Sequence, residues 1–164
     1  MKNIVLDSTE ISNKLKRISF EIIEKNLSEK EIILLGILPN GKFLTDKIKT
    51  HILNNSKIKT SVFYLDIDKK NFFIKKISPD FNKEIIKEKV VILIDDVMNS
   101  AATLMYSINK ILEFSPKEIQ IAVLIERYYK NFPLVPNFKG LELSTSKSEH
   151  VKVKLDKSPK VIIL

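Results

Sequence analysis

The chain has 164 residues, which suits a single domain spanning residues 1–164 with room for a hydrophobic core. Apolar residues make up 44% of it and no apolar run reaches the length of a membrane span, so a soluble globular protein without a membrane partner is expected. No signal peptide is recognisable at the start. The absence of cysteine excludes disulfides and thiolate metal sites and fits a cytoplasmic location. His51 and His150 lack the spacing of zinc ligands.

The net charge of +8 would attract phosphates, nucleotides or nucleic acid. Only two of the 28 basic residues are arginine, Arg17 and Arg127, and the lysines are scattered along the whole chain. Specific readers of nucleic acid usually combine arginine forks with stacking aromatic residues. The charge pattern therefore favours a solvated lysine surface over a nucleic-acid footprint.

In chain order, the apolar spacing first predicts a helix over residues 8–26, opened by Asp7 and Glu10 as a capping box. A buried strand over 32–38 and a helix over 41–53 follow. Residues 62–67 form a predicted strand that pairs with residues 72–77 as a hairpin. A buried strand over 90–94 then leads to a helix that starts near residue 102. A buried strand over 119–125 follows, and the loop-rich last third of the chain has predicted strands near 151–155 and 161–164. Strands alternating with helices predict an α/β fold, a single doubly wound parallel sheet flanked by helices.

The stretch VVILIDDVMNSAATL, residues 90–104, carries the main functional signal. Asp95 and Asp96 should lie at the carboxyl end of the strand, because burying unpaired carboxylates is very costly and open α/β sheets bind ligands at that edge. The amino end of the following helix favours a phosphate, with Ser100 and Thr103 as extra donors. The carboxylates would accept hydrogen bonds from sugar hydroxyls or face a magnesium ion. The alternative is an N-capping turn without any ligand, in which Ser100 caps the helix.

Four of these residues, Asp95, Asp96, Ser100 and Thr103, resemble the phosphoribosyl pyrophosphate (PRPP) motif of type I phosphoribosyltransferases, whose glycine is replaced here by Ala101. The last third, residues 119–156, is similar to the PyrR family of bifunctional pyrimidine operon attenuation proteins and uracil phosphoribosyltransferases. It shares Arg127, Pro133, a Phe-Lys-Gly turn at residues 138–140 and the run 144–149. The resemblance implies a type I phosphoribosyltransferase fold with a small hood and a hairpin loop.

The resemblance also implies a role for each segment. The ribose hydroxyls would contact Asp95 and Asp96, and the hairpin lysines Lys69 and Lys70 would neutralise the departing pyrophosphate. The 5-phosphate of PRPP would lie on the turn formed by Asn99, Ser100, Ala101, Ala102 and Thr103. The pyrophosphate would follow the loop Leu38, Pro39, Asn40 and Gly41, and the base would lie near Ile125 and Arg127. Magnesium would arrive with PRPP and take no direct protein ligand. Read without the resemblance, the loop is an ordinary strand-to-helix turn and the hairpin tip is a solvated turn.

Three departures from the family pattern bear on activity. Asn40 stands where a basic residue is usual, and Ala101 would cost roughly 1 kcal/mol if the phosphate turn needs a positive φ. Tyr128, Tyr129 and Lys130 replace small, histidine and arginine residues, and we interpret the tyrosines as packing over a loop.

Asn99 stands where members acting on 6-oxopurines have an aspartate, and an amide cannot perform that acid/base step, which favours a pyrimidine such as uracil. Two hypotheses remain open: a phosphoribosyltransferase without a covalent nucleophile, and a weakly active or inactive regulator that binds nucleotide or RNA. Relatives are generally dimers or larger, so a homo-oligomer is implied.

Overall fold

The inner strands of the central sheet, such as β2 and β5, are aliphatic and buried on both faces. We describe residues 3–164 of a computed structural model. The spatial order of the six strands is β4 (Phe73–Ser78), β3 (Lys59–Asp68), β2 (Glu31–Ile37), β5 (Val90–Met98), β6 (Glu118–Arg127) and β7 (Phe138–Leu143). All neighbours are parallel except β3 and β4, which form the predicted antiparallel hairpin. A mostly parallel sheet with strands buried on both faces requires cover on each side.

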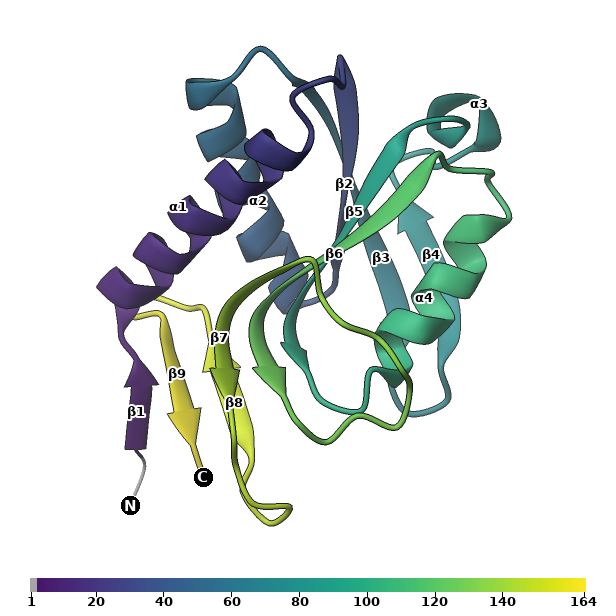
Figure 1. Ribbon diagram of the computed structural model, residues 1–164. Helices are drawn as coiled ribbons and strands as arrows, with labels where there is room; N and C mark the ends of the chain where they lie inside the picture. The colour runs from purple at the N-terminus through teal and green to yellow at the C-terminus, as the bar shows by residue number, and fades with distance from the viewer. Residues whose placement is uncertain (1–2) are drawn as a thin grey trace.

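Helices supply that cover on both faces, which confirms the doubly wound α/β architecture (Figure 1). On one face, α1 (Ser8–Lys25) and α2 (Asn40–Asn55) pack on one hydrophobic cluster, which includes Ile18 and Ile48. On the other face, α4 (Ala102–Leu112) and the short α3 (Lys83–Ile86) pack on a second cluster, which includes Leu104 and Ile86. Within residues 3–164, no helix combines the length and apolar character needed to cross a membrane.

A second, smaller sheet forms a hood beside the carboxyl ends of the central strands. It consists of β1 (Asn3–Leu6), β9 (Lys160–Ile163) and β8 (Val151–Lys154) in that order, all antiparallel (Figure 1). The hood joins the two ends of the chain, and β8 contacts β5. Apolar positions of this small sheet, such as Val153 and Val161, are buried in the same cluster as α1 and α2. The hood therefore shares its core with the main sheet.

The predicted elements agree with the structure except at four places, one of which is β5, whose predicted end at residue 94 lies instead at Met98. The capping box at Asp7 and Glu10 is confirmed, since each backbone amide binds the other side chain at 2.8 Å. The strand β1 and the helix α3 were not predicted. The expected turn at residues 138–140 is wrong, because these residues begin β7, which pairs in parallel with β6. Gly140 is required there for close packing, since an added Cβ would lie 2.5 Å from the carbonyl oxygen of Leu124.

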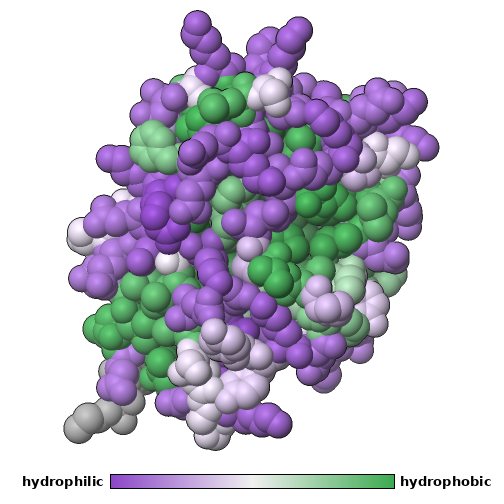
Figure 2. All heavy atoms as spheres, in the orientation of Figure 1, coloured by the Kyte–Doolittle hydropathy of each residue, from purple (hydrophilic) through white to green (hydrophobic). Residues whose placement is uncertain are grey.

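The surface is mostly hydrophilic on the face shown in Figure 2, with apolar areas between the charged side chains. Large apolar side chains that are more than half exposed include Leu27, Phe73, Tyr128 and Val135. Tyr128 is 65% exposed, so the expected packing of this tyrosine over a loop is not observed. Isolated exposed apolar residues are common on folded proteins and do not by themselves indicate a binding surface.

Candidate active site

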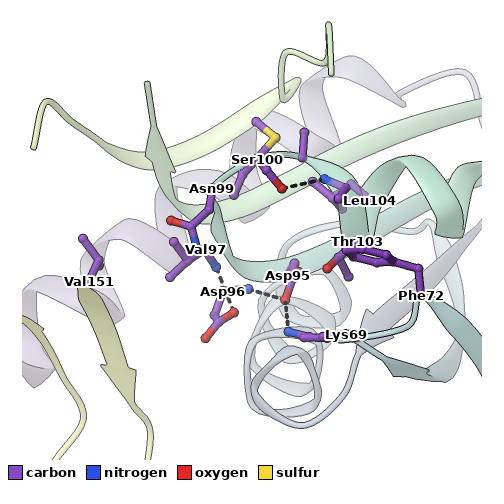
Figure 3. Close-up of a pocket in the computed structure, with 13 residues that line it drawn as sticks. Lys69, Phe72, Asp95, Asp96, Val97, Asn99, Ser100, Thr103, Leu104 and Val151 are labelled. Atoms are coloured by element: carbon purple, nitrogen blue, oxygen red, sulfur yellow. Dashed lines mark hydrogen bonds and ion pairs between the residues drawn. The ribbon is translucent and has the colours of Figure 1, made fainter. Parts of the chain in front are cut away.

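A cavity of about 330 Å³ lies where β5 ends and α4 begins, at the carboxyl edge of the parallel sheet. Open α/β sheets bind their ligands at this edge. The lining comes from the hairpin tip (Lys69, Phe72), the end of β5, the turn before α4, the first turn of α4, and Val151 of the hood (Figure 3). Segments far apart in the sequence therefore converge on the turn that the sequence singled out.

Asp95 is buried, with 2% of its surface exposed. Its Oδ1 accepts a hydrogen bond from the backbone amide of Asp96 at 2.9 Å and lies 3.6 Å from Nζ of Lys69 (Figure 3). Burial, and then the charge of Asp96, raise the pKa of Asp95 to about 8, although Lys69 opposes the shift. The expected end of the strand before Asp95 is wrong, because β5 continues to Met98. A buried carboxyl can lie within the strand because it is paired and because its raised pKa lets it hold a proton.

Asp96 is half-buried and is held by the loop that precedes α2. Its Oδ1 accepts a hydrogen bond from the amide of Val97 at 2.8 Å, and its Oδ2 accepts one from Nδ2 of Asn40 at 2.7 Å. The same Nδ2 also donates to the carbonyl oxygen of Val153 in the hood at 3.2 Å. Asn40 therefore joins the predicted pyrophosphate loop, the carboxylate pair and the hood.

Lys42, which follows Gly41 in the sequence, contacts Asp46 and Tyr64 rather than the carboxylate pair. Its Nζ lies 3.2 Å from Oδ2 of Asp46, 3.3 Å from the hydroxyl of Tyr64 and 4.4 Å from the centre of the Tyr64 ring. None of the four residues predicted to bind pyrophosphate, Leu38 to Gly41, lines the cavity; Pro39 and Asn40 border a second, open hollow facing β8. The positive charge that the family usually places on this loop is thus not at the carboxylate pair.

The turn before α4 leaves backbone amides free for an anion. The N-cap of α4 is Ala101, and it makes no side-chain cap hydrogen bond. The Ser100 hydroxyl accepts only from the amide of Ala102, at 3.2 Å. Within residues 3–164, the amides of Thr103 and Leu104 have no acceptor. An N-cap side chain would accept from one of these two amides, and neither is accepted here, so the arrangement favours an anion site over the capping alternative.

The hairpin tip lies over the cavity. Phe72 adopts a positive φ of 54°, and its ring stacks on Tyr106 of α4, with centroids 4.8 Å apart and planes 5° apart. Asp68 closes the turn by accepting the amides of Lys70 and Asn71. Of the two candidate lysines, only Lys69 lines the cavity, whereas Lys70 is exposed at the tip.

The two residues expected at the base pocket are both buried. Ile125 has no exposed surface and belongs to the core cluster below α1, so it presents no surface to a base and its expected role does not fit. Arg127 is 7% exposed. Its guanidinium donates to the hydroxyl of Thr145, to the carbonyl oxygens of Ser146 and Glu149, and to Oδ1 of Asn99 at 3.0 Å. Arg127 thus anchors the segment before β8 to the turn before α4, and each of its three nitrogens donates a hydrogen bond.

Comparison with known proteins identifies the family. Residues 2–158 match the model of the phosphoribosyl transferase domain. The chain belongs to the phosphoribosyltransferase family. It is 35% identical to a protein named Bifunctional protein PyrR from Fusobacterium nucleatum, covering 98% of this chain and 97% of that protein. It is 36% identical to a protein of the same name from Clostridium botulinum (strain Eklund 17B), covering 95% and 91%.

Solved structures show the same phosphoribosyltransferase fold. The hypoxanthine phosphoribosyltransferase of Trypanosoma cruzi aligns with a TM-score of 0.81 and 12% identity, covering 99% of this chain and 95% of that one. A hypoxanthine-guanine phosphoribosyltransferase from Bacillus anthracis aligns with a TM-score of 0.74 and 16% identity, covering 91% and 86%. At such low identities the likeness concerns the fold alone.

Sequence reasoning located the turn of this phosphoribosyltransferase but missed the contacts that arrange it. The bonds Asn40–Asp96 and Arg127–Asn99 join residues 56 and 28 positions apart, respectively. No local pattern marks such a pair. The stacking of Phe72 on Tyr106 could not be predicted either, because the two residues are 34 positions apart and both rings fit ordinary apolar positions.

Replacing Ala101 with glycine tests the phosphate turn. Ala101 has φ 68° and ψ 8°, the left-handed conformation for which sequence analysis assigned a cost of roughly 1 kcal/mol. Its methyl group is packed in the core with 4% of the residue exposed, and losing a buried methyl costs about 0.8 kcal/mol. The two effects nearly cancel, so Ala101→Gly should leave the free energy of unfolding almost unchanged.

Binding should respond more strongly than folding to this change. Because glycine adopts the turn without strain and lets the amides adjust to a phosphate, the dissociation constant of PRPP should fall by up to about tenfold. Isothermal titration calorimetry with PRPP and circular dichroism measure the two properties. An unchanged or weaker affinity in Ala101→Gly would contradict the role assigned to this position.

Proposed function

We propose that this phosphoribosyltransferase transfers ribose 5-phosphate from PRPP to a nucleobase. The observation that carries the proposal is the cavity in which the free amides of Thr103 and Leu104 face the same space as Asp95, Asp96 and Lys69. An anion at the helix amino end beside a carboxylate pair matches a sugar phosphate, whose phosphate seeks donors and whose hydroxyl groups seek acceptors.

In this proposal each group has a defined task. The turn from Asn99 to Thr103 holds the 5-phosphate, and Asp96, oriented by Asn40, accepts hydrogen bonds from the ribose hydroxyls. A base nitrogen forms a bond to C1 of the ribose while the bond from C1 to the pyrophosphate oxygen breaks, and the proton of that nitrogen passes to the departing pyrophosphate. Lys69, the only cation in the cavity lining within residues 3–164, offsets charge on the pyrophosphate. Positioning and charge neutralisation supply the rate enhancement.

A magnesium ion carried by PRPP fits the donor set. Magnesium is bound mainly by substrate phosphates and water, together with one or two carboxylates. In this proposal the ion stays on the phosphates of PRPP and takes no direct protein ligand, with Asp95 and Asp96 facing it from the cavity lining. Within residues 3–164 no group of three or more His, Cys, Asp or Glu side chains gathers in one place. The ion would neutralise the pyrophosphate group as it leaves.

The proposed base is a pyrimidine such as uracil. Asn99 lines the cavity with an amide, which cannot take the purine proton that an aspartate would handle. The resemblance to the PyrR family, which includes uracil phosphoribosyltransferases, supports the same base, and the relatives reported above carry the name Bifunctional protein PyrR. A cytoplasmic homo-oligomer is part of the same proposal, on the strength of the resemblance.

Pyrophosphate release with PRPP, magnesium and a panel of uracil, cytosine, hypoxanthine and guanine tests the function. Pyrophosphate release is expected with uracil, and the absence of release with every base would refute the proposed enzymatic activity. Lys69→Met should lower kcat by tenfold or more, because it removes the cavity's cation. Lys76→Met, at an exposed lysine of β4, is the matched control and should match the wild type.

A second candidate is a weakly active or inactive regulator that binds nucleotide or RNA. It is favoured by the neutral amide of Asn40 at the pyrophosphate loop and by the contact of Lys42 with Asp46 and Tyr64. RNA affinity should then fall steeply as salt rises, because counterions are released on binding. A flat or absent binding curve would remove the RNA part of this candidate.

A further inference from the structure

The contact between Arg127 and Asn99 fixes which end of the Asn99 amide faces the cavity. The guanidinium group has donors only, so the atom of Asn99 that meets it at 3.0 Å must be the acceptor Oδ1. The opposite end of the amide, the NH2 group at Nδ2, then points away from Arg127. Within residues 3–164 no group accepts a hydrogen bond from this Nδ2. Asn99 is exposed and lines the cavity (Figure 3).

Arg127 itself cannot turn away from this contact easily. Its Nε and Nη2 donate to Thr145 at 3.0 and 2.7 Å, and Nη2 also donates to the carbonyl oxygens of Glu149 at 2.9 Å and Ser146 at 3.2 Å. Its guanidinium also lies 5.5 Å from the centre of the Tyr129 ring. A buried planar group with its donors engaged in a fixed pattern gives the amide of Asn99 one preferred orientation.

We propose that Arg127 is a positioning residue that makes Asn99 a hydrogen-bond donor toward the ligand, so that this position selects for a ligand atom that accepts. The inference rests on the proposed function and deepens it. The accepting atom is a carbonyl oxygen of the base or an oxygen of the sugar phosphate, two sources with the same chemistry. An aspartate at this position would present an acceptor instead and would favour a different ligand face.

The first test compares ligand affinities without requiring turnover. Isothermal titration calorimetry measures uridine 5′-monophosphate and ribose 5-phosphate on the wild type, Asn99→Leu and Asn99→Asp. Asn99→Leu removes the donor with little change in size and should weaken binding about tenfold. Asn99→Asp keeps an acceptor for Arg127 but turns a second acceptor toward the ligand, so it should weaken binding at least as much. Weaker binding of both ligands assigns the contact to the sugar phosphate, and weaker binding of the nucleotide alone assigns it to the base.

The second test isolates positioning. If Arg127 orients the amide, Asn99→Leu should weaken ligand binding about tenfold in the wild-type background. In an Arg127→Met background, where the amide is free to turn, the same change should weaken binding less than about threefold. Thr145→Val is the matched control, because it removes a different contact of Arg127 and leaves the bond to Asn99, and the tenfold cost should persist in it. A merely structural role of Arg127 would not change the cost of Asn99→Leu.

Each result decides the matter. Affinities of Asn99→Asp and Asn99→Leu within twofold of the wild type would overturn the donor role, and this outcome does not depend on whether Arg127→Met folds. An equal tenfold cost in both Arg127 backgrounds would overturn positioning while leaving the donor role in place. A wild type that binds neither ligand overturns this inference together with the proposed function, whereas binding without turnover overturns the enzyme alone.

Discussion

Replacing Asp95 with asparagine is expected to stabilise the fold at pH 8 and to lower pyrophosphate release by a hundredfold or more. Asp95 is buried, and burial together with the charge of Asp96 raises its pKa to about 8. An asparagine is similar in shape and never ionises, so it removes the cost of a buried charge. Lys69, which loses its partner, is 42% exposed and is solvated. The same change removes a carboxylate from the pair that would bind the ribose.

The stability difference between Asp95→Asn and the wild type should depend on pH. Because the folded state holds the Asp95 proton more tightly than the unfolded chain, whose carboxyl titrates near its ordinary value of about 4, the wild type loses stability as pH rises from about 4 to about 8. Above that range the loss is complete. The variant lacks this slope, so its advantage should be small near pH 5 and largest near pH 8.5.

Thermal unfolding across this pH range measures the effect. Each kcal/mol shifts Tm by roughly 2–4 °C in a chain of this size, so we expect a Tm gain of more than about 5 °C at pH 8.5. Glu24→Gln, at an exposed position of α1, is the control and should follow the wild-type profile. Parallel profiles for Asp95→Asn and the wild type would show that Asp95 is ionised normally in the folded protein.

Replacing Gly41 with alanine is expected to destabilise the protein and to displace the pyrophosphate loop. An added Cβ would lie 2.9 Å from the carbonyl oxygen of Ile94 and 3.1 Å from the carbonyl carbon of Gly36. Both neighbours are backbone atoms of buried strands, so neither can move aside at low cost. Overpacking of this kind typically costs about 1–3 kcal/mol. Because Asn40 precedes Gly41 and Ile94 precedes Asp95, the contact of Asn40 with Asp96 should shift as well, and PRPP affinity should fall tenfold or more.

A second glycine separates the local effect from general destabilisation. Gly140→Ala would also create a backbone clash, at 2.5 Å from the carbonyl oxygen of Leu124, but on β7 and outside the cavity lining. Chemical denaturation should show both variants destabilised, whereas titration with PRPP under native conditions should show weakened binding only in Gly41→Ala. Equal losses of affinity in the two variants would contradict the specific role of the loop.

Gly41 also shows how a correct prediction can rest on an incomplete reason. The Pro-Asn-Gly sequence predicted a turn before a helix, and the structure places Gly41 in the first turn of α2. No glycine among residues 3–164 has a positive φ, so conformational freedom is not what the position requires. The requirement is close approach between α2, β2 and β5, which depends on how three separate segments pack.

The sequence by itself determined the elements whose signals are local. Runs of aliphatic residues determined the buried strands, apolar spacing determined α1, α2 and α4, and the order of these elements determined the doubly wound sheet. The stretch around Asp95, Asp96, Ser100 and Thr103 located the cavity, because a strand, a turn and a helix amino end adjoin along the chain.

Only the tertiary structure decided the burial, the pKa values and the hydrogen-bond partners of the residues in that cavity. Packing of β5 between β2 and β6 buries Asp95 and raises its pKa. Asn40 orients Asp96 and Arg127 orients Asn99, and both partners come from other elements. The packing of the sheet against α4 brings together the rings of Phe72 and Tyr106, which hold the hairpin over the cavity. The hood likewise depends on pairing the two ends of the chain. Such contacts depend on long-range geometry, which local residue patterns do not encode.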